Sequence, residues 1–202
     1  DDINASGYGL TFGLHSRIDD RVQRILSKVD VGNLYINRNQ IGAVVGSQPF
    51  GGHGLSGTGP KAGGPRYLPR FALQNLLCME GDSPPRMTAK EVSCAFAKKF
   101  SFLPLMPVDL PGPTGESNRY SLVPRRRVLC MGPGAEKYAE RALKLGCYAV
   151  AATLDENDLT LIEDLEAVVY AGPNSARVRQ TLSKRAGPIV PTLMDENFEI
   201  WL

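Results

Sequence analysis

The stretch IGAVVGSQPFGG, residues 41–52, combines four aliphatic residues with four glycines. Glycine has no Cβ, so its backbone can approach a ligand closely. The consecutive N–H groups of Gly42 and Ala43 could form a concave donor site for an anion such as a carboxylate. Phe50 would then supply an aromatic wall. On the residues alone, this carboxylate-binding loop and a surface loop with several turns both stay open.

The four cysteines are the other residues whose type suggests chemistry. Cys78, Cys94, Cys130 and Cys147 show no C-x-x-C spacing, and the chain has only two histidines. We therefore expect no metal site. Cys130 lies in an apolar run and is predicted to be a buried thiol. Free thiols without an export signal favour a reducing, cytoplasmic environment.

Two weaker patterns lie in the glycine-rich region at 38–65. Gly54, Gly59 and Lys61 have nearly the spacing of a phosphate-binding loop, but Pro60 lacks the N–H group that would hold a phosphate. We reject that interpretation. His53 has no nucleophile arrangement around it, and we interpret it as an exposed loop histidine rather than an acid–base group.

The composition is that of an ordinary globular protein. The 202 residues are 43% apolar and 22% charged, with a formal net charge of +2. This charge gives no reason to expect a nucleic-acid partner, and we interpret the basic run at 125–127 as a solvated strand edge. No apolar run is long enough to span a bilayer. The sequence has no initiator Met and opens as though inside an element, so we expect a fragment of a longer chain.

Apolar periodicity predicts the elements that position the loop. A helical pattern predicts a helix over about 18–29, capped by Ser16. Alternation predicts a strand over 31–36, just before the glycine-rich loop. Five prolines between 101 and 126 predict an extended connector, preceded by a short helix within 86–100.

The last 75 residues repeat one plan of apolar strand, Gly-Pro turn, helix and closing glycine. Gly132-Pro133 and Gly172-Pro173 open the two turns, 40 residues apart. In the first helix, a face from Ala135 to Leu143 is predicted to be buried, and Gly146 to end the helix in a left-handed cap. Strands alternating with helices predict a parallel, Rossmann-like sheet.

A nucleotide-binding role for this tail stays open as an alternative. Gly132-Pro133-Gly134 follows a strand, as in a dinucleotide fingerprint, but Lys137 stands at the third glycine position. Pro133 and Pro173 each remove an N–H group that a phosphate would bind. We expect the tail to bind no dinucleotide.

Several phrases together resemble the proline utilization A family of bifunctional bacterial enzymes. They are INASGYGLTFGLHSR, VGNLYINRN, GAVVGSQPFGGHGLSGTGPKAGG and LPGPTGESNRYSL. The resemblance implies an α/β fold: residues 1–80 form the C-terminal part of an aldehyde dehydrogenase catalytic domain, residues 81–126 a Pro-rich connector, and residues 127–202 a small Rossmann-like accessory domain.

The resemblance also implies a function for the opening stretch. The N–H groups of Gly42 and Ala43 would bind the α-carboxylate of L-glutamate-γ-semialdehyde, and Phe50 would pack on its aliphatic part. The parent would oxidise this aldehyde to glutamate with a cysteine nucleophile and NAD, and a separate proline dehydrogenase part would carry FAD. For the parent we further expect a cytoplasmic location and a homo-oligomer, and peripheral attachment to the membrane is left open.

Departures from the family limit what this chain could do alone. None of its four cysteines has the context of the family's nucleophile, so no catalytic residue is assigned and the fragment is expected to be inactive. His53 stands where an acidic residue is expected. Another aldehyde dehydrogenase remains an alternative source. The tail is expected to act as a lid, with an outer apolar surface from Val178, Leu182 and the end of the chain: Phe198, Ile200, Trp201 and Leu202.

Overall fold

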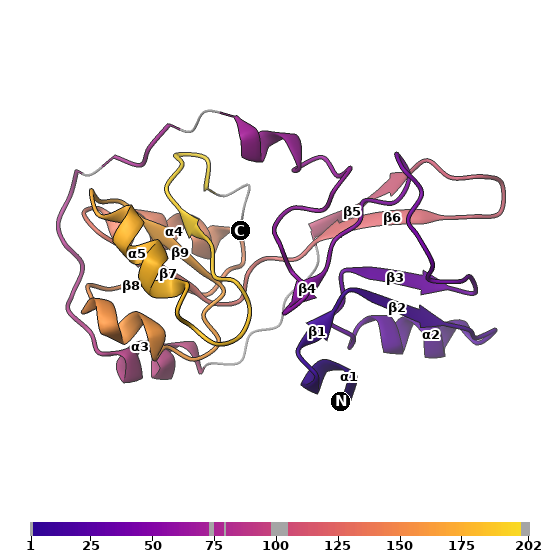
Figure 1. The fold of residues 1–202 in the computed structure, drawn as a ribbon, viewed down its shortest axis with the longest axis horizontal. Coiled ribbons are helices and arrows are strands. Elements are labelled where there is room, and N and C mark those ends of the chain that lie inside the picture. The colour runs from indigo at the N-terminus through magenta and orange to yellow at the C-terminus, as the bar shows by residue number, and fades with distance from the viewer. Residues whose placement is uncertain (1, 73–74, 79, 98–104, 199–202) are drawn as a thin grey trace. The chain divides into compact units, whose positions relative to one another are not determined.

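The computed structural model describes residues 2–72, 75–78, 80–97 and 105–198 (Figure 1). The chain divides into two compact units. The first contains Asp1–Ala72, Pro107–Tyr120 and Gly187–Ile189, and the second contains Leu73–Met106, Ser121–Ala186 and Val190–Leu202. These units are groups of contacting residues, so the domain limits expected at 80 and 126 stay a prediction.

The first unit is built on a β-α-β arrangement. Strands β2 (Thr11–Leu14) and β3 (Asn33–Ile36) pair in parallel, and helix α2 (Asp19–Leu26) connects them. The short helix α1 (Asp2–Ala5) leads into β1 (Tyr8–Gly9), which pairs antiparallel with β4 (His53–Gly54). The glycine-rich loop therefore begins at the end of β3 and returns to the unit at β4.

The predicted helix and strand of this unit are confirmed, with shorter bounds. Helix α2 begins at Asp19 after Ile18, and the predicted cap is wrong because no side chain caps the helix. The hydroxyl of Ser16 instead accepts a hydrogen bond from the N–H of Ile18 at 3.2 Å. Val22 of α2 and Tyr35 of β3 are buried.

The Pro-rich segment contains more structure than an extended connector. Strands β5 (Leu105–Leu110) and β6 (Asn118–Leu122) form a two-stranded sheet. Both strands of such a sheet are edges, where a proline can turn its missing donor outward, so Pro107 is tolerated in β5. The short helix expected before it is confirmed as α3 (Ala89–Phe96), and the 3-10 turn η1 (Leu68–Phe71) lies earlier in the chain.

The second unit is an α/β layer with a wholly parallel sheet, as predicted. Its strand order is β10-β9-β7-β8. The bounds of its elements are β7 (Val128–Met131), α4 (Ala135–Lys144), β8 (Ala149–Ala151), η2 (Glu156–Thr160), β9 (Ala167–Tyr170), α5 (Ser175–Leu182) and β10 (Thr192–Leu193).

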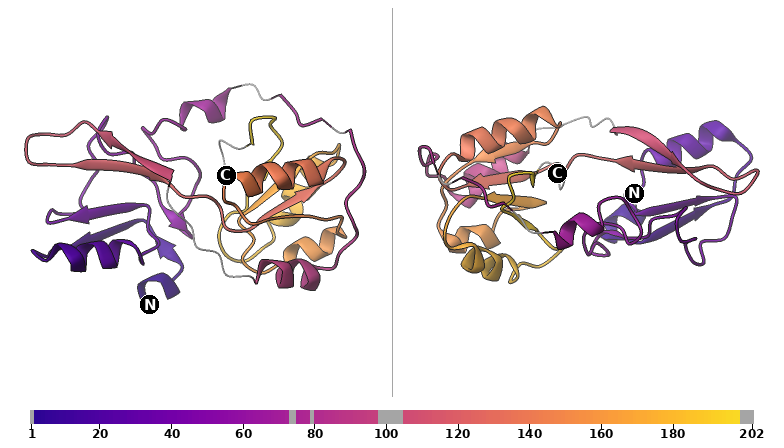
Figure 2. Two further views of the ribbon diagram at one scale, coloured as in Figure 1. Left: turned by 180° about the vertical axis from the view of Figure 1, so that it is seen from behind. Right: turned by 90° about the horizontal axis from the view of Figure 1, so that it is seen from above.

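Both faces of this sheet are covered. Val128 and Cys130 of β7 belong to the core beneath α4, whereas Leu129 and Met131 belong to the core beneath α3 and α5. Seen from behind, α4 lies in front of the strands (Figure 2). All four residues of β7 are buried, as expected for a central parallel strand that has helices on both sides.

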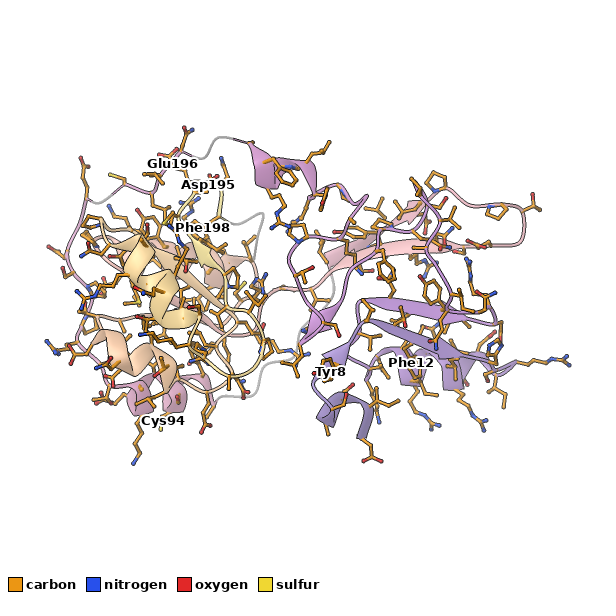
Figure 3. The ribbon with its side chains drawn as sticks, viewed as in Figure 1. Tyr8, Phe12, Cys94, Asp195, Glu196 and Phe198 are labelled. Carbon is orange, nitrogen blue, oxygen red and sulfur yellow. The ribbon has the colours of Figure 1, made fainter. Side chains whose placement is uncertain are left out.

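Several expected surface residues lie inside this unit. Val178, Leu182 and Phe198 were expected on an outer apolar face, but all three are buried in its core. Phe198, labelled in Figure 3, packs edge-on against Tyr138 with ring centroids 5.8 Å apart. The remaining members of that expected surface, Ile200, Trp201 and Leu202, lie outside the described residues.

The first helix of the tail matches its prediction with one exception. Ala135, Tyr138, Ala139 and Ala142 are buried, but Leu143 is 45% exposed. Gly146 follows the helix with φ +86°, the left-handed conformation that the sequence predicted.

The basic run at 125–127 is not simply a solvated edge. The guanidinium of Arg125 donates to the carbonyl oxygen of Glu166, and Arg127 pairs with Asp164. These contacts connect the start of β7 to the segment that leads into β9. Within the described part of the chain, no helix has the length and apolarity to cross a membrane.

Candidate functional site

The candidate anion-binding groups lie at a glycine turn between β3 and β4. Gly42 has φ +74°, a left-handed conformation that glycine adopts without strain. Gly42 is exposed and Ala43 is half-buried. Among the described residues, neither backbone N–H has a hydrogen-bond acceptor. The turn therefore presents two successive donors.

Gln48 closes this turn from within the loop. The side-chain oxygen of Gln48 accepts a hydrogen bond from the backbone N–H of Val44 at 3.0 Å. The backbone N–H of Gln48 donates to the carbonyl oxygen of Val44 at 2.9 Å. The third N–H in the series 42–44 is thus used inside the loop. Only the first two remain available for a ligand.

Glu116, in the turn between β5 and β6, holds Gln48 in place. One carboxylate oxygen accepts from Gln48 Nε2 at 2.9 Å, from Asn118 Nδ2 at 3.0 Å and from Arg38 Nη1 at 3.1 Å. The side chains of Arg38 and Glu116 are only 30% and 28% exposed. The turn between β5 and β6 is thereby joined to both ends of the glycine turn.

A second set of contacts holds Phe50. Its N–H donates to the carbonyl oxygen of Ala62 at 3.0 Å, and the Ala62 N–H donates back to Phe50 at 2.8 Å. On the other side, the amide of Asn33 donates to the carbonyl oxygen of Pro49 at 2.9 Å and accepts the N–H of Gly51 at 3.2 Å. The backbone on both sides of Phe50 is therefore fixed to β3.

Lys61 completes this second set of contacts. The Nζ atom of Lys61 donates to the carbonyl oxygens of Gly32 and Gly51 at 2.5 and 2.8 Å, and to Asn33 Oδ1 at 2.9 Å. We call this set the Phe50 clamp, and it consists of Gly32, Asn33, residues 49–51 and Lys61. All three hydrogens of the ammonium group are thus used. Partial burial lowers the pKa of Lys61 to about 8.

The structure places Gly42, Ala43 and Phe50 on one loop, but the residues that support them were not predicted. Gln48 lies in the opening stretch but was given no role there, Glu116 lies in a phrase used only to establish the resemblance, and Lys61 was considered only for a phosphate loop. The available signal was the one Asp, Glu, Lys or Arg in each of two short phrases, Glu116 in LPGPTGESN and Lys61 in GLSGTGPKAGG. Such a residue needs a partner when it becomes partly buried.

The cysteines and His53 show no catalytic arrangement among the described residues. Burial raises the pKa of Cys130 to about 12 and that of Cys147 to about 11, so both thiols are poor nucleophiles near neutral pH. Cys78 and Cys94 are exposed, and Cys94 lies on α3 (Figure 3). The exposed His53 pairs with Gly9 in the β1–β4 sheet. The described residues contain no cluster of three or more side chains suited to a metal ion.

The first Gly-Pro turn of the tail is covered by the chain's own backbone. The N–H of Gly134, at the start of α4, donates to the carbonyl oxygen of Asp82 at 3.0 Å. A Cβ on Gly134 would lie 2.7 Å from the carbonyl oxygen of Glu80. Gly132 approaches the second turn so closely that a Cβ would lie 1.8 Å from the carbonyl oxygen of Ala171. These glycines thus serve close backbone packing.

Comparison with known proteins gives consistent matches. The aldehyde dehydrogenase family model matches residues 1–75. The bifunctional protein PutA of Rhizobium meliloti is 38% identical over 222 aligned positions, which cover 98% of this chain and 17% of that protein. A 1-pyrroline-5-carboxylate dehydrogenase of Bacillus licheniformis is 51% identical over 65 residues, covering 32% of this chain and 13% of the relative.

A solved structure of a Bradyrhizobium japonicum proline utilization A variant is 70% identical over 35% of this chain and 7% of that one, with a TM-score of 0.35. The chain spans less than a fifth of the length of each of these relatives. The PutA match includes the tail as well as the part that matches the family model. Residues 1–75 are therefore similar to the aldehyde dehydrogenase family, within a chain that is similar over nearly its whole length to the bifunctional PutA protein of Rhizobium meliloti.

Proposed function

We propose that this chain serves a PutA-type protein that oxidises L-glutamate-γ-semialdehyde to glutamate, and that it supplies the carboxylate anchor. The N–H groups of Gly42 and Ala43 bind the two oxygens of the substrate's α-carboxylate. Phe50 packs on the aliphatic part of the substrate. NAD would accept the hydride and FAD would serve a separate proline dehydrogenase part, while the nucleophilic cysteine would come from outside these 202 residues.

The observation that carries this proposal is the pair of N–H groups that have no acceptor among the described residues. They follow one another at a left-handed glycine, and the next N–H, that of Val44, is already bonded to Gln48. Two successive backbone donors are suited to binding a carboxylate. The name of the Bacillus licheniformis relative supports this substrate, because 1-pyrroline-5-carboxylate is the cyclised form of the semialdehyde.

The test is Ala43→Pro in the full-length protein, with Ala43→Gly as the matched control. Proline removes one donor, whereas glycine removes only the methyl group and keeps the N–H. A hydrogen bond to a charged group is worth about 1.5–3 kcal/mol, so KM for the semialdehyde should rise about tenfold or more in Ala43→Pro. An equal KM in the two variants would refute the anchor.

We further propose that the tail is an accessory unit that binds no dinucleotide. The N–H of Gly134, the residue before α4, already donates to the carbonyl oxygen of Asp82, at the place where a pyrophosphate would bind. A role of the tail as a lid stays a proposal. Val178, Leu182 and Phe198 do not support it, because all three are buried inside the second unit. NAD titrated into residues 73–202, which include α3, should show no binding, and a micromolar dissociation constant would refute this.

The third alternative, another type of aldehyde dehydrogenase, is disfavoured by the PutA match over 98% of the chain. A cytoplasmic location and a homo-oligomeric parent stay predictions. The expectation that these 202 residues are inactive alone is tested directly. NADH formation from the semialdehyde by the purified chain would contradict it.

A further inference from the structure

Glu116 is connected to the carboxylate anchor through one side chain. Its carboxylate accepts from Gln48 Nε2 at 2.9 Å, and Asn118 Oδ1 accepts from the same nitrogen at 3.2 Å. An amide has two N–H donors on its nitrogen and none on its oxygen. With both donors directed to Glu116 and Asn118, the oxygen of Gln48 must face the opposite way, toward Val44.

This orientation decides which backbone groups of the turn can bind a ligand. Gln48 Oε1 accepts the Val44 N–H at 3.0 Å, so the third donor of the series is used. If the amide were reversed, its NH₂ group would face the Val44 N–H, and two donors would oppose each other. The Val44 N–H would then lose its acceptor, and only backbone hydrogen bonds to the Val44 carbonyl oxygen would hold the turn from within. The two free donors at Gly42 and Ala43 depend on this single orientation.

The ion pair beneath the turn also controls the local charge. Arg38 lies 3.1 Å from Glu116, and both side chains are largely covered. A lone carboxylate in this position would oppose the binding of an anionic substrate and would be costly to bury. Paired with Arg38, it can orient Gln48 without adding net negative charge. Asn118 Nδ2 also donates to the carbonyl oxygen of Pro111, which fixes the turn that carries Glu116.

We propose that Glu116 is a positioning residue for substrate recognition, acting through Gln48 to hold the donors of Gly42 and Ala43 in place. This inference rests on the proposed carboxylate anchor. It assigns to the turn between β5 and β6 a role in selecting aldehydes that carry an α-carboxylate. An aldehyde without this group gains nothing from the arrangement.

The experiment compares two substrates in the full-length protein. L-glutamate-γ-semialdehyde has the carboxylate, and pentanal has the same chain length without it. The variants are Gln48→Ala and Glu116→Gln. The control is Asp109→Asn, which makes the same carboxylate-to-amide change on β5, in an exposed pair with Arg119. Among the residues that the structure describes, Asp109 makes no hydrogen bond or ion pair with the glycine turn.

We expect KM for the semialdehyde to rise about fivefold in Gln48→Ala and in Glu116→Gln, since one hydrogen bond no longer orders the turn. The kcat for the semialdehyde and kcat/KM for pentanal should stay unchanged, and Asp109→Asn should match the wild type. An equal fall for both substrates would mean a purely structural role and would overturn the inference, as would an unchanged KM. Should Glu116→Gln lack pentanal turnover because it fails to fold, Gln48→Ala decides.

Measuring Ala43→Pro alongside separates the two proposals. If Ala43→Pro leaves KM unchanged, the anchor itself fails and this inference fails with it. If Ala43→Pro raises KM but Gln48→Ala does not, the anchor stands and the positioning role is refuted. Hydrogen exchange of peptides covering 41–48 gives a second readout. It should be faster in Gln48→Ala and Glu116→Gln than in Asp109→Asn, and equal rates would overturn the inference.

Discussion

Replacing Gly32 by alanine should release the backbone that carries Phe50. Gly32 stands just before β3, and a Cβ at this position would lie 1.8 Å from the carbonyl oxygen of Gly51. Real Cβ atoms essentially never come closer than 3.0 Å to such an atom, so the two segments must separate by at least about 1.2 Å. The obstacle is backbone rather than a flexible side chain, and a rotamer change cannot relieve it.

The size of the effect follows from the Phe50 clamp. The bond from Asn33 to the Pro49 carbonyl is 2.9 Å long and that from Gly51 to Asn33 is 3.2 Å, so a shift of this size stretches both beyond hydrogen-bonding distance. Two such bonds contribute about 2 kcal/mol. The free energy of local opening at Gly51 should fall by about this amount, and its amide should exchange about 30-fold faster.

The assay is hydrogen exchange on the full-length protein, with Gly13→Ala as the matched control. Gly13 lies in β2, and neither glycine has a positive φ. A Cβ on Gly13 would meet only the side chain of Gln40, at 3.2 Å. The control should leave exchange at Gly51 within about twofold of the wild type. Equal exchange at Gly51 in the two variants would refute the clamp, even if Gly32→Ala lowered the overall stability.

The remaining predictions concern titration and thiol reactivity. Since burial lowers the pKa of Lys61 to about 8 from 10.5, the unfolded chain binds more protons than the folded one between these values, and this group makes folding more favourable as pH rises through that window. The difference in thermal midpoint between the wild type and Lys61→Met should therefore change in favour of the wild type from pH 8 to pH 10. A difference that stays constant over this range would contradict the lowered pKa of Lys61. A thiol reagent at pH 8 should modify the exposed Cys78 and Cys94 at once, but Cys130 and Cys147 only after unfolding, because burial raises the pKa values of these two thiols. Four rapidly reacting thiols in the native protein would show this burial to be wrong.

Local patterns predicted the elements well, because each depends on neighbours in the sequence. The strand before the loop, the helix α2 and the alternating units of the tail all follow from short-range periodicity. The hairpin of β5 and β6 was missed because its prolines argue against a strand, and only the two-stranded pairing makes them acceptable. Phe198 was assigned to an outer surface because sequence alone does not show that it packs against Tyr138.

The glycine turn shows why its chemistry could be predicted while its support could not. Gly42 and Ala43 are adjacent, so their residue types alone suggest a donor pair. Their geometry depends on Glu116, whose contact with Gln48 crosses 68 positions of sequence. A flexible glycine turn would lose conformational freedom on binding, and that loss would weaken the hold on a carboxylate. The Glu116 contacts order the turn before the substrate arrives, so the same two donors can bind more tightly than in a loop without this support.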